Sequence, residues 1–208
     1  KISTRYGATR VFEGRTYNGI KHQIESVVIH TTGNKASAKN EAANIFNNEG
    51  INSFHAVVDK HGVYETVRFS DTAHHAGDYS VNLRTLGFEL TDDNAAAGYE
   101  NYIKYIAFVL WQLKITPNKN TIKFHNEIVN TSCGSYLRGL GKEKIIKDLK
   151  SYIDLINGGE KPQEKPKPQD KPKPPIKPNP SKENYKVVAE NGYFKPNREV
   201  PIKNKPLN

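Results

Sequence analysis

The sequence lacks any long apolar run. No segment of its 208 residues approaches the roughly 18 consecutive apolar residues of a membrane-spanning helix. Residues 1–10 also lack the apolar core of a secretory signal, so we expect neither a membrane span nor an export signal. Methionine is absent altogether, which indicates that the N-terminus has been trimmed.

The chain has little cysteine. Its single thiol, Cys133, rules out a disulfide within the chain. Stability must therefore come from a packed core, and the thiol needs another explanation. Hydrophobic residues make up 36% of the chain, which is enough for one domain of ordinary size and a more polar remainder.

The formal net charge of +9 raises the question of an anionic partner. Residues 1–157 carry 19 Lys and Arg against 16 Asp and Glu, residues 158–184 carry 7 against 4, and residues 185–208 carry 5 against 2. The basic excess is therefore densest in the last quarter of the chain. A basic tail suits an anionic polymer, and the sign of the charge does not choose between nucleic acids and bacterial envelope polymers.

The composition of the chain changes at Gly158. Eight of the twelve prolines fall within residues 162–180, among repeated Lys-Pro pairs. Such a segment has no apolar face to bury, and each proline removes a backbone donor, so residues 158–184 are predicted to form an extended linker. Short alternating apolar stretches in residues 185–208 predict the truncated opening of a small β-domain, and a disordered basic tail is the alternative.

Residues 1–157 mix strand and helix patterns. Apolar or alternating residues predict strands at 26–31, 53–59, 63–67 and 85–91, with Gly62 supplying the turn of a hairpin. Amphipathic spacing predicts helices at about 37–48, 99–113 and 142–156. Strands and helices that share one sheet define an α/β or α+β domain.

Three residues have the side chains and the placement of metal ligands. His30 ends an apolar predicted strand, where ligands of α/β sheets gather, although a histidine satisfied within the core is the alternative. His125 and Cys133 lie eight residues apart in a turn-rich loop that could curl both side chains toward one point. Two imidazoles and a thiolate suit zinc and leave a fourth position open for water. A buried, inert thiol is the alternative for Cys133.

Glu89 is the candidate general base. A water bound to zinc becomes a nucleophile near neutral pH, but it needs a group to take its proton. Glu89 lies in an apolar predicted strand, where loss of solvent would raise the pKa of its carboxyl. Simple alternation with Phe88 and Leu90 would instead point Glu89 to solvent.

The remaining histidines carry weaker signals. His74 and His75 lie in a loop of small residues that allows a ligand to approach, so at least one ring could contact substrate. A weak surface metal site is the alternative for this pair. His22 and His61 are expected to face solvent and His55 to be structural, so these three receive no role.

Six segments occur in an order that resembles a known family: Val27–Thr32, Asn40–Ala43, Ser53–Asp59, Ala73–Asp78, Leu86–Glu89 and His125–Cys133. The family is that of the zinc-dependent N-acetylmuramoyl-L-alanine amidases, the type shared by phage lysozyme-type amidases, bacterial autolysins and peptidoglycan recognition proteins. The resemblance covers about residues 20–157. The ordered set is much more specific than any one of its segments.

The resemblance implies a central mixed β-sheet flanked by helices, with zinc in a groove on one face. It implies that His30, His125 and Cys133 hold the zinc, that Glu89 activates the attacking water, and that His75 borders the substrate groove. The bond attacked would be the amide between the lactyl group of N-acetylmuramic acid and the L-alanine of the peptidoglycan stem peptide. We also expect a monomer that acts at the bacterial cell wall without a nucleic-acid partner.

The chain departs from the family pattern in three places. Phe54 stands where several relatives carry a catalytic tyrosine beside the substrate, so the auxiliary hydroxyl is absent there or its role falls to Glu89. Thr131 stands where some relatives have lysine, and it is a candidate hydrogen-bonding helper in catalysis. The usual Cys-Pro-Gly becomes Cys133-Gly134-Ser135. None of these changes removes a predicted zinc ligand.

The C-terminal residues also resemble a known module. Residues 191–204 are similar to the start of a bacterial SH3-like wall-binding module, so the linker would tether residues 1–157 to the wall. A non-catalytic peptidoglycan-binding module of the same fold is the competing hypothesis. Cys133 favours catalysis, because binding-only members of the fold commonly lack this ligand. A nucleic-acid-binding protein is more remote, because the charge of residues 1–157 is nearly balanced.

Overall fold

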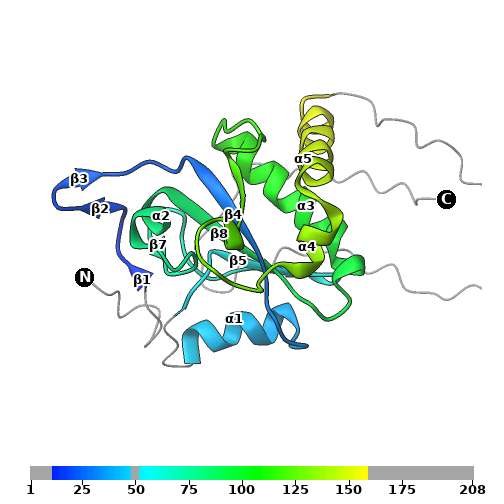
Figure 1. Cartoon of the computed structure of the whole chain (residues 1–208), viewed down its shortest axis with the longest axis horizontal. Coiled ribbons are helices and arrows are strands. Elements are labelled where there is room, and N and C mark those ends of the chain that lie inside the picture. The colour runs from blue at the N-terminus through cyan, green and yellow to red at the C-terminus, as the bar shows by residue number, and fades with distance from the viewer. Residues whose placement is uncertain (1–10, 48–51, 159–208) are drawn as a thin grey trace, which may run out of the picture.

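The computed structural model describes residues 11–47 and 52–158 (Figure 1). The predicted linker beyond Gly158 and the predicted β-domain opening lie outside the described residues. The described part is built around a mixed five-stranded sheet. In sheet order the strands are β6 (Gly62–Glu65), β5 (Ala56–Asp59), β8 (Thr85–Leu90), β4 (Ser26–Thr31) and β9 (Ile122–Phe124). Only β6 runs antiparallel to its neighbour, and the other neighbouring pairs in this sheet are parallel.

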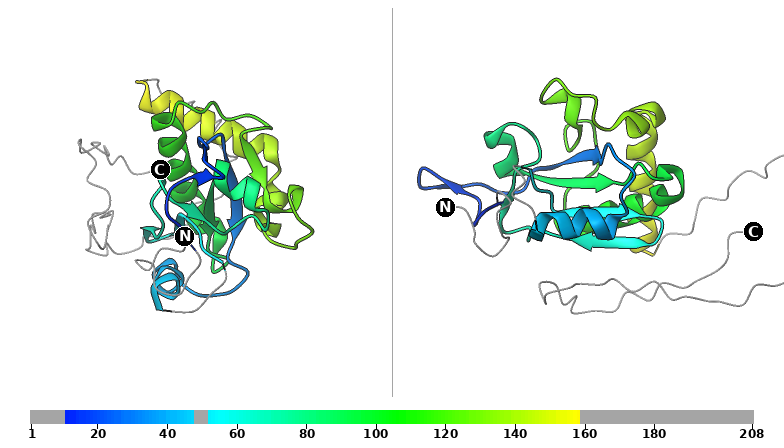
Figure 2. Two further views of the ribbon diagram at one scale, coloured as in Figure 1. Left: turned by 90° about the vertical axis from the view of Figure 1, so that its left-hand side faces the viewer. Right: turned by 90° about the horizontal axis from the view of Figure 1, so that it is seen from below.

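Helices cover both faces of this sheet (Figure 2). One face packs against α3 (Ala95–Gln112), α4 (Ser135–Leu140) and α5 (Lys142–Ile156). The other face carries α1 (Ala38–Asn47). Alternation along β5 serves both layers, because Ala56 and Val58 lie in the larger core while Val57 lies in the core beneath α1. This mixed sheet between helices is the fold class that the sequence predicted.

The central strands are apolar runs because both of their faces are covered. In β4 every residue is buried, and in β8 only Glu89 is partly exposed. The predicted strands at 26–31 and 85–91 are confirmed, the second ending one residue earlier. Helix α5 begins and ends at the predicted residues, while α3 begins four residues before the predicted start because Ala95–Ala97 are good helix formers.

Asp59 organises the hairpin between β5 and β6. Its Oδ1 accepts the N–H groups of His61 and Gly62, at 2.7 and 3.1 Å. Its Oδ2 accepts the N–H of Ala38, the first residue of α1, at 3.0 Å. The hairpin is confirmed, but the turn is made by the Asp59 side chain, and Gly62 is already the first residue of β6.

Three short strands near the N-terminus form an arm that precedes the five-stranded sheet. The arm consists of β1 (Val11–Phe12), β2 (Thr16–Tyr17) and β3 (Ile20–Lys21), and β1 pairs with β7 (Thr72–Ala73). Helix α2 (Tyr79–Arg84) leads directly into β8. These short elements carry too little periodicity to be predicted from sequence. None of the helices in the described part of the chain is long and apolar enough to cross a bilayer.

Candidate metal centre and active site

The three predicted metal ligands meet at the carboxyl edge of the sheet. His30 lies near the end of β4, and His125 directly follows β9, the parallel neighbour of β4. Cys133 lies in the loop before α4, with its Sγ 3.6 Å from His30 Nδ1. The ring centroids of His30 and His125 lie 4.5 Å apart. One possible ligand atom from each of the three residues lies within 4.8 Å of the other two.

The donor set at this cluster fits a metal ion. Both ring nitrogens of His125 are buried and have no hydrogen-bond partner among the described residues. Burial lowers the pKa of both histidines, with the neighbouring rings adding to the effect at His30, so both favour the neutral form that binds metal. Burial also raises the pKa of the Cys133 thiol to about 11, and nearby Glu89 adds to the rise. Two imidazoles and one thiol, gathered with unused lone pairs, match the ligands of a zinc site with an open position.

The loop that carries Cys133 is held by its own hydrogen bonds. Thr131 Oγ1 accepts the N–H of Cys133 at 3.1 Å. The Arg138 guanidinium donates to the carbonyls of Thr131, Ser132 and Cys133, at 2.9–3.3 Å. Gly134 has a φ of 76°, a left-handed conformation closed to proline, and its N–H donates to Thr31 Oγ1. The departure from the Cys-Pro-Gly pattern therefore has a local backbone cause.

Glu89 lies on the same face of the sheet as His30. The two residues are paired in register between β8 and β4, and facing residues of neighbouring strands share a face. Phe88 and Leu90 point into the large core on the other face. The expected alternation is present, but it points Glu89 into the site, where Oε2 is buried and has no partner among the described residues.

The electrostatics of Glu89 follow from this position. Loss of solvent raises the pKa of its carboxyl to about 8, and the negative charges of Glu41 and Asp92 add to the rise. A carboxyl with a pKa close to neutrality suits a group that takes up and releases a proton. The combination of perturbed pKa and proximity to a metal-ligand cluster is typical of active sites.

Two residues that are expected to border the substrate are largely buried. His75 is only 7% exposed, and its Nδ1 lies 3.2 Å from Nε2 of His30, a predicted metal ligand. Phe54 is 8% exposed and packs in the core cluster beneath α1 with Ala42 and Ile45. Neither side chain offers much surface to a polymer, because each is covered by the elements that the sheet brings over it.

Sequence reasoning missed two buried residues, Arg15 and Asn82, whose hydrogen bonds fix the backbone around His75 and α2. Arg15 is buried, and its guanidinium donates to the carbonyls of Phe69, Asn82, Leu83 and Thr85, at 2.7–3.1 Å. A single arginine in a polar stretch carries no sequence signal of this role. Asn82 Oδ1 accepts the N–H groups of His75 and Ala76, in the loop after β7. The sequence carries no signal of this role, because the burial of Asn82 appears only in the structure.

His55, to which we assign no catalytic role from its sequence context, is fully buried. Its Nδ1 accepts the N–H of Gly87 at 3.0 Å, and its Nε2 lies 2.9 Å from the Arg15 guanidinium. Burial and the charge of Arg15 hold the pKa of this imidazole well below its ordinary value. His61 is exposed as predicted, whereas His22 is half-buried.

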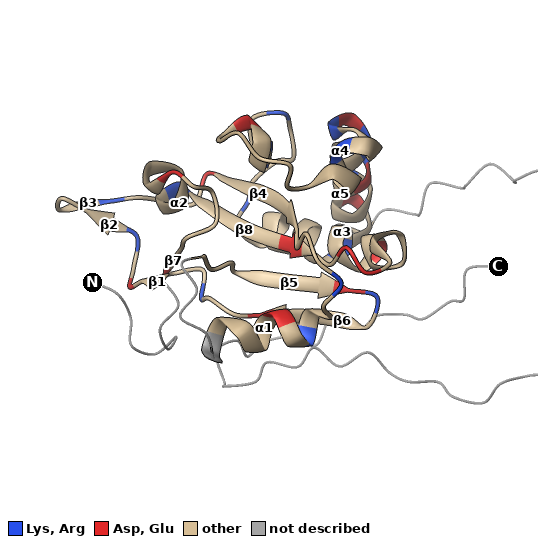
Figure 3. Cartoon of the chain, turned by 60° about the horizontal axis from the view of Figure 1, so that its bottom comes forward, with Lys and Arg blue, Asp and Glu red and all other residues tan. Residues whose placement is uncertain are grey.

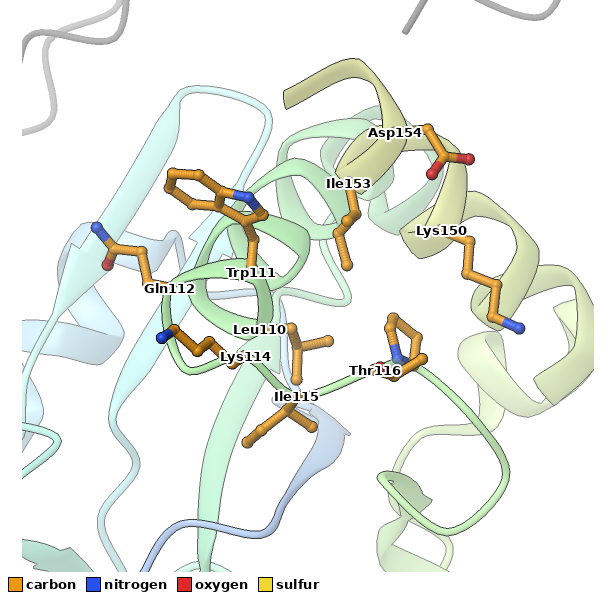
Figure 4. Close-up of a pocket in the computed structure, with 10 residues that line it drawn as sticks. Leu110, Trp111, Gln112, Lys114, Ile115, Thr116, Lys150, Ile153 and Asp154 are labelled. Atoms are coloured by element: carbon orange, nitrogen blue, oxygen red, sulfur yellow. The ribbon is translucent and has the colours of Figure 1, made fainter. Parts of the chain in front are cut away.

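On the described elements, charged side chains of one sign do not gather at a second site. Acidic and basic residues are interspersed on the described elements, including α1 and α5 (Figure 3). A hollow lies where α3 ends and α5 passes (Figure 4), lined among others by Leu110, Trp111, Ile115, Lys150 and Ile153. The chain continues from this end of α3 to the start of β9, so the hollow lies toward the amino edge of the parallel strands. The metal-ligand cluster is at the opposite edge.

The fold and the site together define an α/β domain with a candidate His-His-Cys metal centre and a neighbouring perturbed carboxylate. The model of the N-acetylmuramoyl-L-alanine amidase family matches residues 20–135, which is more than half of the chain. The chain belongs to this family, and the matched segment contains His30, Glu89, His125 and Cys133.

Individual relatives agree with the family match. The chain is 29% identical over 147 residues to the N-acetylmuramoyl-L-alanine amidase CwlA of Bacillus sp., and the match covers 66% of this chain but only 58% of that protein. The catalytic domain of XlyA is 20% identical over 66% of this chain and 95% of that domain, with a TM-score of 0.56. Staphylococcus aureus hydrolase AmiA, solved in complex with its ligand, is 20% identical over 65% of this chain and 76% of that chain, with a TM-score of 0.56. The likeness to the two solved structures is one of fold.

Proposed function

We propose that this chain is a zinc-dependent peptidoglycan hydrolase that cleaves the amide between N-acetylmuramic acid and the L-alanine of the stem peptide. The observation that carries the proposal is the convergence of His30, His125 and Cys133 beside Glu89 at one edge of the sheet. Membership of the amidase family supplies the class of bond. Peptidoglycan is then the partner, and the bacterial cell wall is the place of action.

His30, His125 and Cys133 would hold the zinc. A zinc ion bound there supplies Lewis-acid activation of a water molecule and of the scissile carbonyl. The two histidines offer neutral rings with free lone pairs, and Cys133 gives up its thiol proton when it becomes a ligand. The hydrogen bonds from Arg138 hold the Cys133 loop in place during this change.

Glu89 would move the proton of the reaction. Its unpartnered Oε2 faces the site and can accept a proton from the attacking water, then return it to the amine of the leaving L-alanine. The pKa of about 8 belongs to the metal-free site, and a nearby divalent cation would favour the ionised, proton-accepting form. This role accommodates Phe54, which has no hydroxyl to assist.

Thr131 remains our candidate for a second helper. Its Oγ1 already accepts the Cys133 N–H, so its own hydroxyl hydrogen is available for another acceptor. A hydroxyl donor beside the ligand loop suits an oxygen that gains negative charge during amide hydrolysis. Substrate contact by His75 and Phe54 is not part of this proposal, because both are buried.

The decisive experiment is digestion of purified peptidoglycan by the full chain, with zinc and again with a chelator. Mass spectrometry should detect released glycan strands that are intact and free stem peptides that begin with L-alanine. Chelation should abolish the release of both products. Cys133→Ser and Glu89→Gln are each expected to lower the rate by at least about 100-fold, as for loss of a metal ligand or a general base. Wall binding by zinc-loaded protein without cleavage would contradict the enzyme and indicate a recognition module.

The segments beyond the described residues fit a tether. We propose that residues 158–184 link the amidase domain to a wall-binding module opened by residues 185–208, which raises the local concentration of enzyme at the insoluble wall. The full chain should then pellet with purified walls more completely than a chain ending at Gly158, while both cleave soluble muramyl peptides at similar rates. Equal pelleting of the two chains would remove the binding role of the tail.

A further inference from the structure

The hydrogen bonds behind His30 form a chain that leads away from the metal centre. We propose that Thr85 and His75 are positioning residues that fix the tautomer of His30, so that its Nδ1 lone pair faces the metal. The inference builds on the proposed zinc site. It replaces the expected role of His75 at the substrate groove with a role beneath the ligand.

The direction of the chain follows from the single hydroxyl hydrogen of Thr85. Thr85 Oγ1 donates to the carbonyl of Val81 at 2.8 Å. Toward His75 Nε2, 3.1 Å away, the same oxygen can only accept, so this nitrogen of His75 carries a hydrogen. The backbone carbonyl of Thr85 is a further acceptor beside the His75 ring.

The tautomer of His75 then dictates that of His30. A buried neutral imidazole with a hydrogen on Nε2 has its lone pair on Nδ1. His75 Nδ1 lies 3.2 Å from His30 Nε2, so His30 must donate from Nε2 and keep its own lone pair on Nδ1. That atom is the one 3.6 Å from Cys133 Sγ, within the ligand cluster.

The residues around the His75 ring leave space for it and fix its position. A Cβ at Gly87 would lie 2.3 Å from His75 Cγ and 2.6 Å from its Nδ1, so only glycine admits the ring at this place in β8. Asn82 Oδ1 accepts the N–H groups of His75 and Ala76, at 3.2 and 2.8 Å, which fixes the backbone that carries the ring. Together with Thr85, which contacts Nε2 of the ring, Gly87 and Asn82 therefore place one buried imidazole.

The consequence concerns metal affinity. A metal-ligating histidine is held in tautomer and orientation by the partner of its other ring nitrogen, and loss of such a partner typically costs 10–100-fold in affinity. Here that partner is a second histidine, whose own tautomer is set by Thr85. Without His75, the ring of His30 is free to carry its hydrogen on Nδ1, where the metal must bind.

The first test is the tautomeric state in the metal-free protein. Long-range nitrogen-15 NMR spectra of the full chain should show His30 and His75 both neutral with the hydrogen on Nε2. A hydrogen on Nδ1 of either ring would overturn the proposal. The measurement needs neither zinc nor activity, so it decides the inference even if the proposed function fails.

The second test is the zinc dissociation constant, measured by competition with a chelator. His75→Phe keeps a ring over Gly87 but removes the acceptor, and it should weaken zinc binding about 10–100-fold. Thr85→Val should weaken zinc binding less than His75→Phe, because the Thr85 carbonyl remains. Thr85→Ser keeps the hydroxyl and should bind zinc as the wild type does. Thr66→Val is the matched control, since Thr66 is a buried threonine whose hydroxyl donates to the Phe54 carbonyl, and its zinc affinity should stay unchanged.

The outcomes separate the two proposals. A folded His75→Phe protein with unchanged zinc affinity would overturn the positioning role while leaving the amidase proposal intact. Wild-type protein that binds no zinc would overturn the proposed metal site, and the tautomers would then decide the inference alone. If His75→Phe does not fold, the comparison of Thr85→Val with Thr66→Val carries the test.

Discussion

Glu89 is partly buried, and the same alternation that builds the core of the sheet places its side chain. Its neighbours Phe88 and Leu90 fill the core on one face, and Glu89 is left on the face that carries His30. Burial there favours the protonated carboxyl, because the charged form loses solvation that no partner among the described residues replaces. The residue best suited to move a proton is therefore also a source of instability.

The pH dependence of stability should reveal this. Glu89 has an ordinary pKa of 4.5 when unfolded and about 8 when folded, so between these values the folded state holds a proton that the unfolded state has lost. The contribution of Glu89 to the free energy of unfolding of the metal-free protein should fall as pH rises through this window, by at most about 1.4 kcal/mol per pH unit for one proton, and the difference between wild type and Glu89→Gln isolates it from the opposite contribution of the buried histidines. Glu89→Gln should remove that slope and be more stable than wild type at pH 9.

Urea unfolding of metal-free protein at pH 5, 7 and 9 measures this effect. Glu143→Gln is the matched control, because the pKa of Glu143 is lowered by Lys119 and its proton linkage lies below the window. A Glu89→Gln protein that keeps the wild-type slope would show that Glu89 is ionised in the fold.

Short elements decide how the site is supported. Helix α2 has only six residues, yet its last carbonyls receive the buried guanidinium of Arg15 from the N-terminal arm. A cation at a helix C-terminus interacts favourably with the helix dipole, and the planar fork satisfies several carbonyls at once. Arg15 of the arm also donates to the carbonyl of Thr85, the first residue of β8. Arg15 therefore connects the arm, α2 and β8 at the residue whose hydroxyl contacts His75.

Arg15→Lys should therefore destabilise the fold. Lysine keeps the charge but cannot reach the carbonyls of Phe69, Asn82 and Thr85 together, which leaves buried acceptors without donors. We expect a loss of about 2–4 kcal/mol in the free energy of unfolding, measured by urea denaturation.

Arg84→Lys provides the comparison for Arg15. Arg84 contacts Ser80 within the exposed part of α2, so its replacement should change stability by no more than about 0.5 kcal/mol. Equal effects of the two substitutions would show that the buried fork of Arg15 contributes little.

At the scale of the whole molecule, the sheet brings together ligands that are distant in sequence. His30 and Cys133 are separated by 103 positions and meet because β4 lies beside the edge strand β9, after which the chain leads into the Cys133 loop. A metal that binds only this assembled arrangement stabilises the folded state over the unfolded chain. The proposed zinc binding would therefore be coupled to folding of the domain.

Metal removal should lower the melting temperature of the full chain. Zinc at about 100 times its dissociation constant contributes about 2.7 kcal/mol, which for a protein of this size corresponds to about 5–10 °C. Thermal unfolding with zinc and with chelator measures the difference. Cys133→Ser should show little change on chelation, and a wild-type protein equally insensitive to chelator would contradict the proposed zinc site.

Much of the fold was predictable because its signals are local. The apolar runs of β4 and β8, and the amphipathic spacing of α5, appear within six to fifteen residues and survive in the structure. The absence of α2 from the prediction has a physical cause. Short or weakly periodic segments are decided by what packs on them.

By itself the sequence determined the chemistry available to this protein: the ligand types of His30, His125 and Cys133, the carboxylate of Glu89, and the strands that present them. Tertiary structure alone decided how that chemistry is arranged. It gathered the ligands, placed His75 behind His30 over Gly87, and buried Arg15 beneath α2. The physical reason is that burial, tautomer and pKa depend on contacts between residues tens of positions apart, which no local pattern contains.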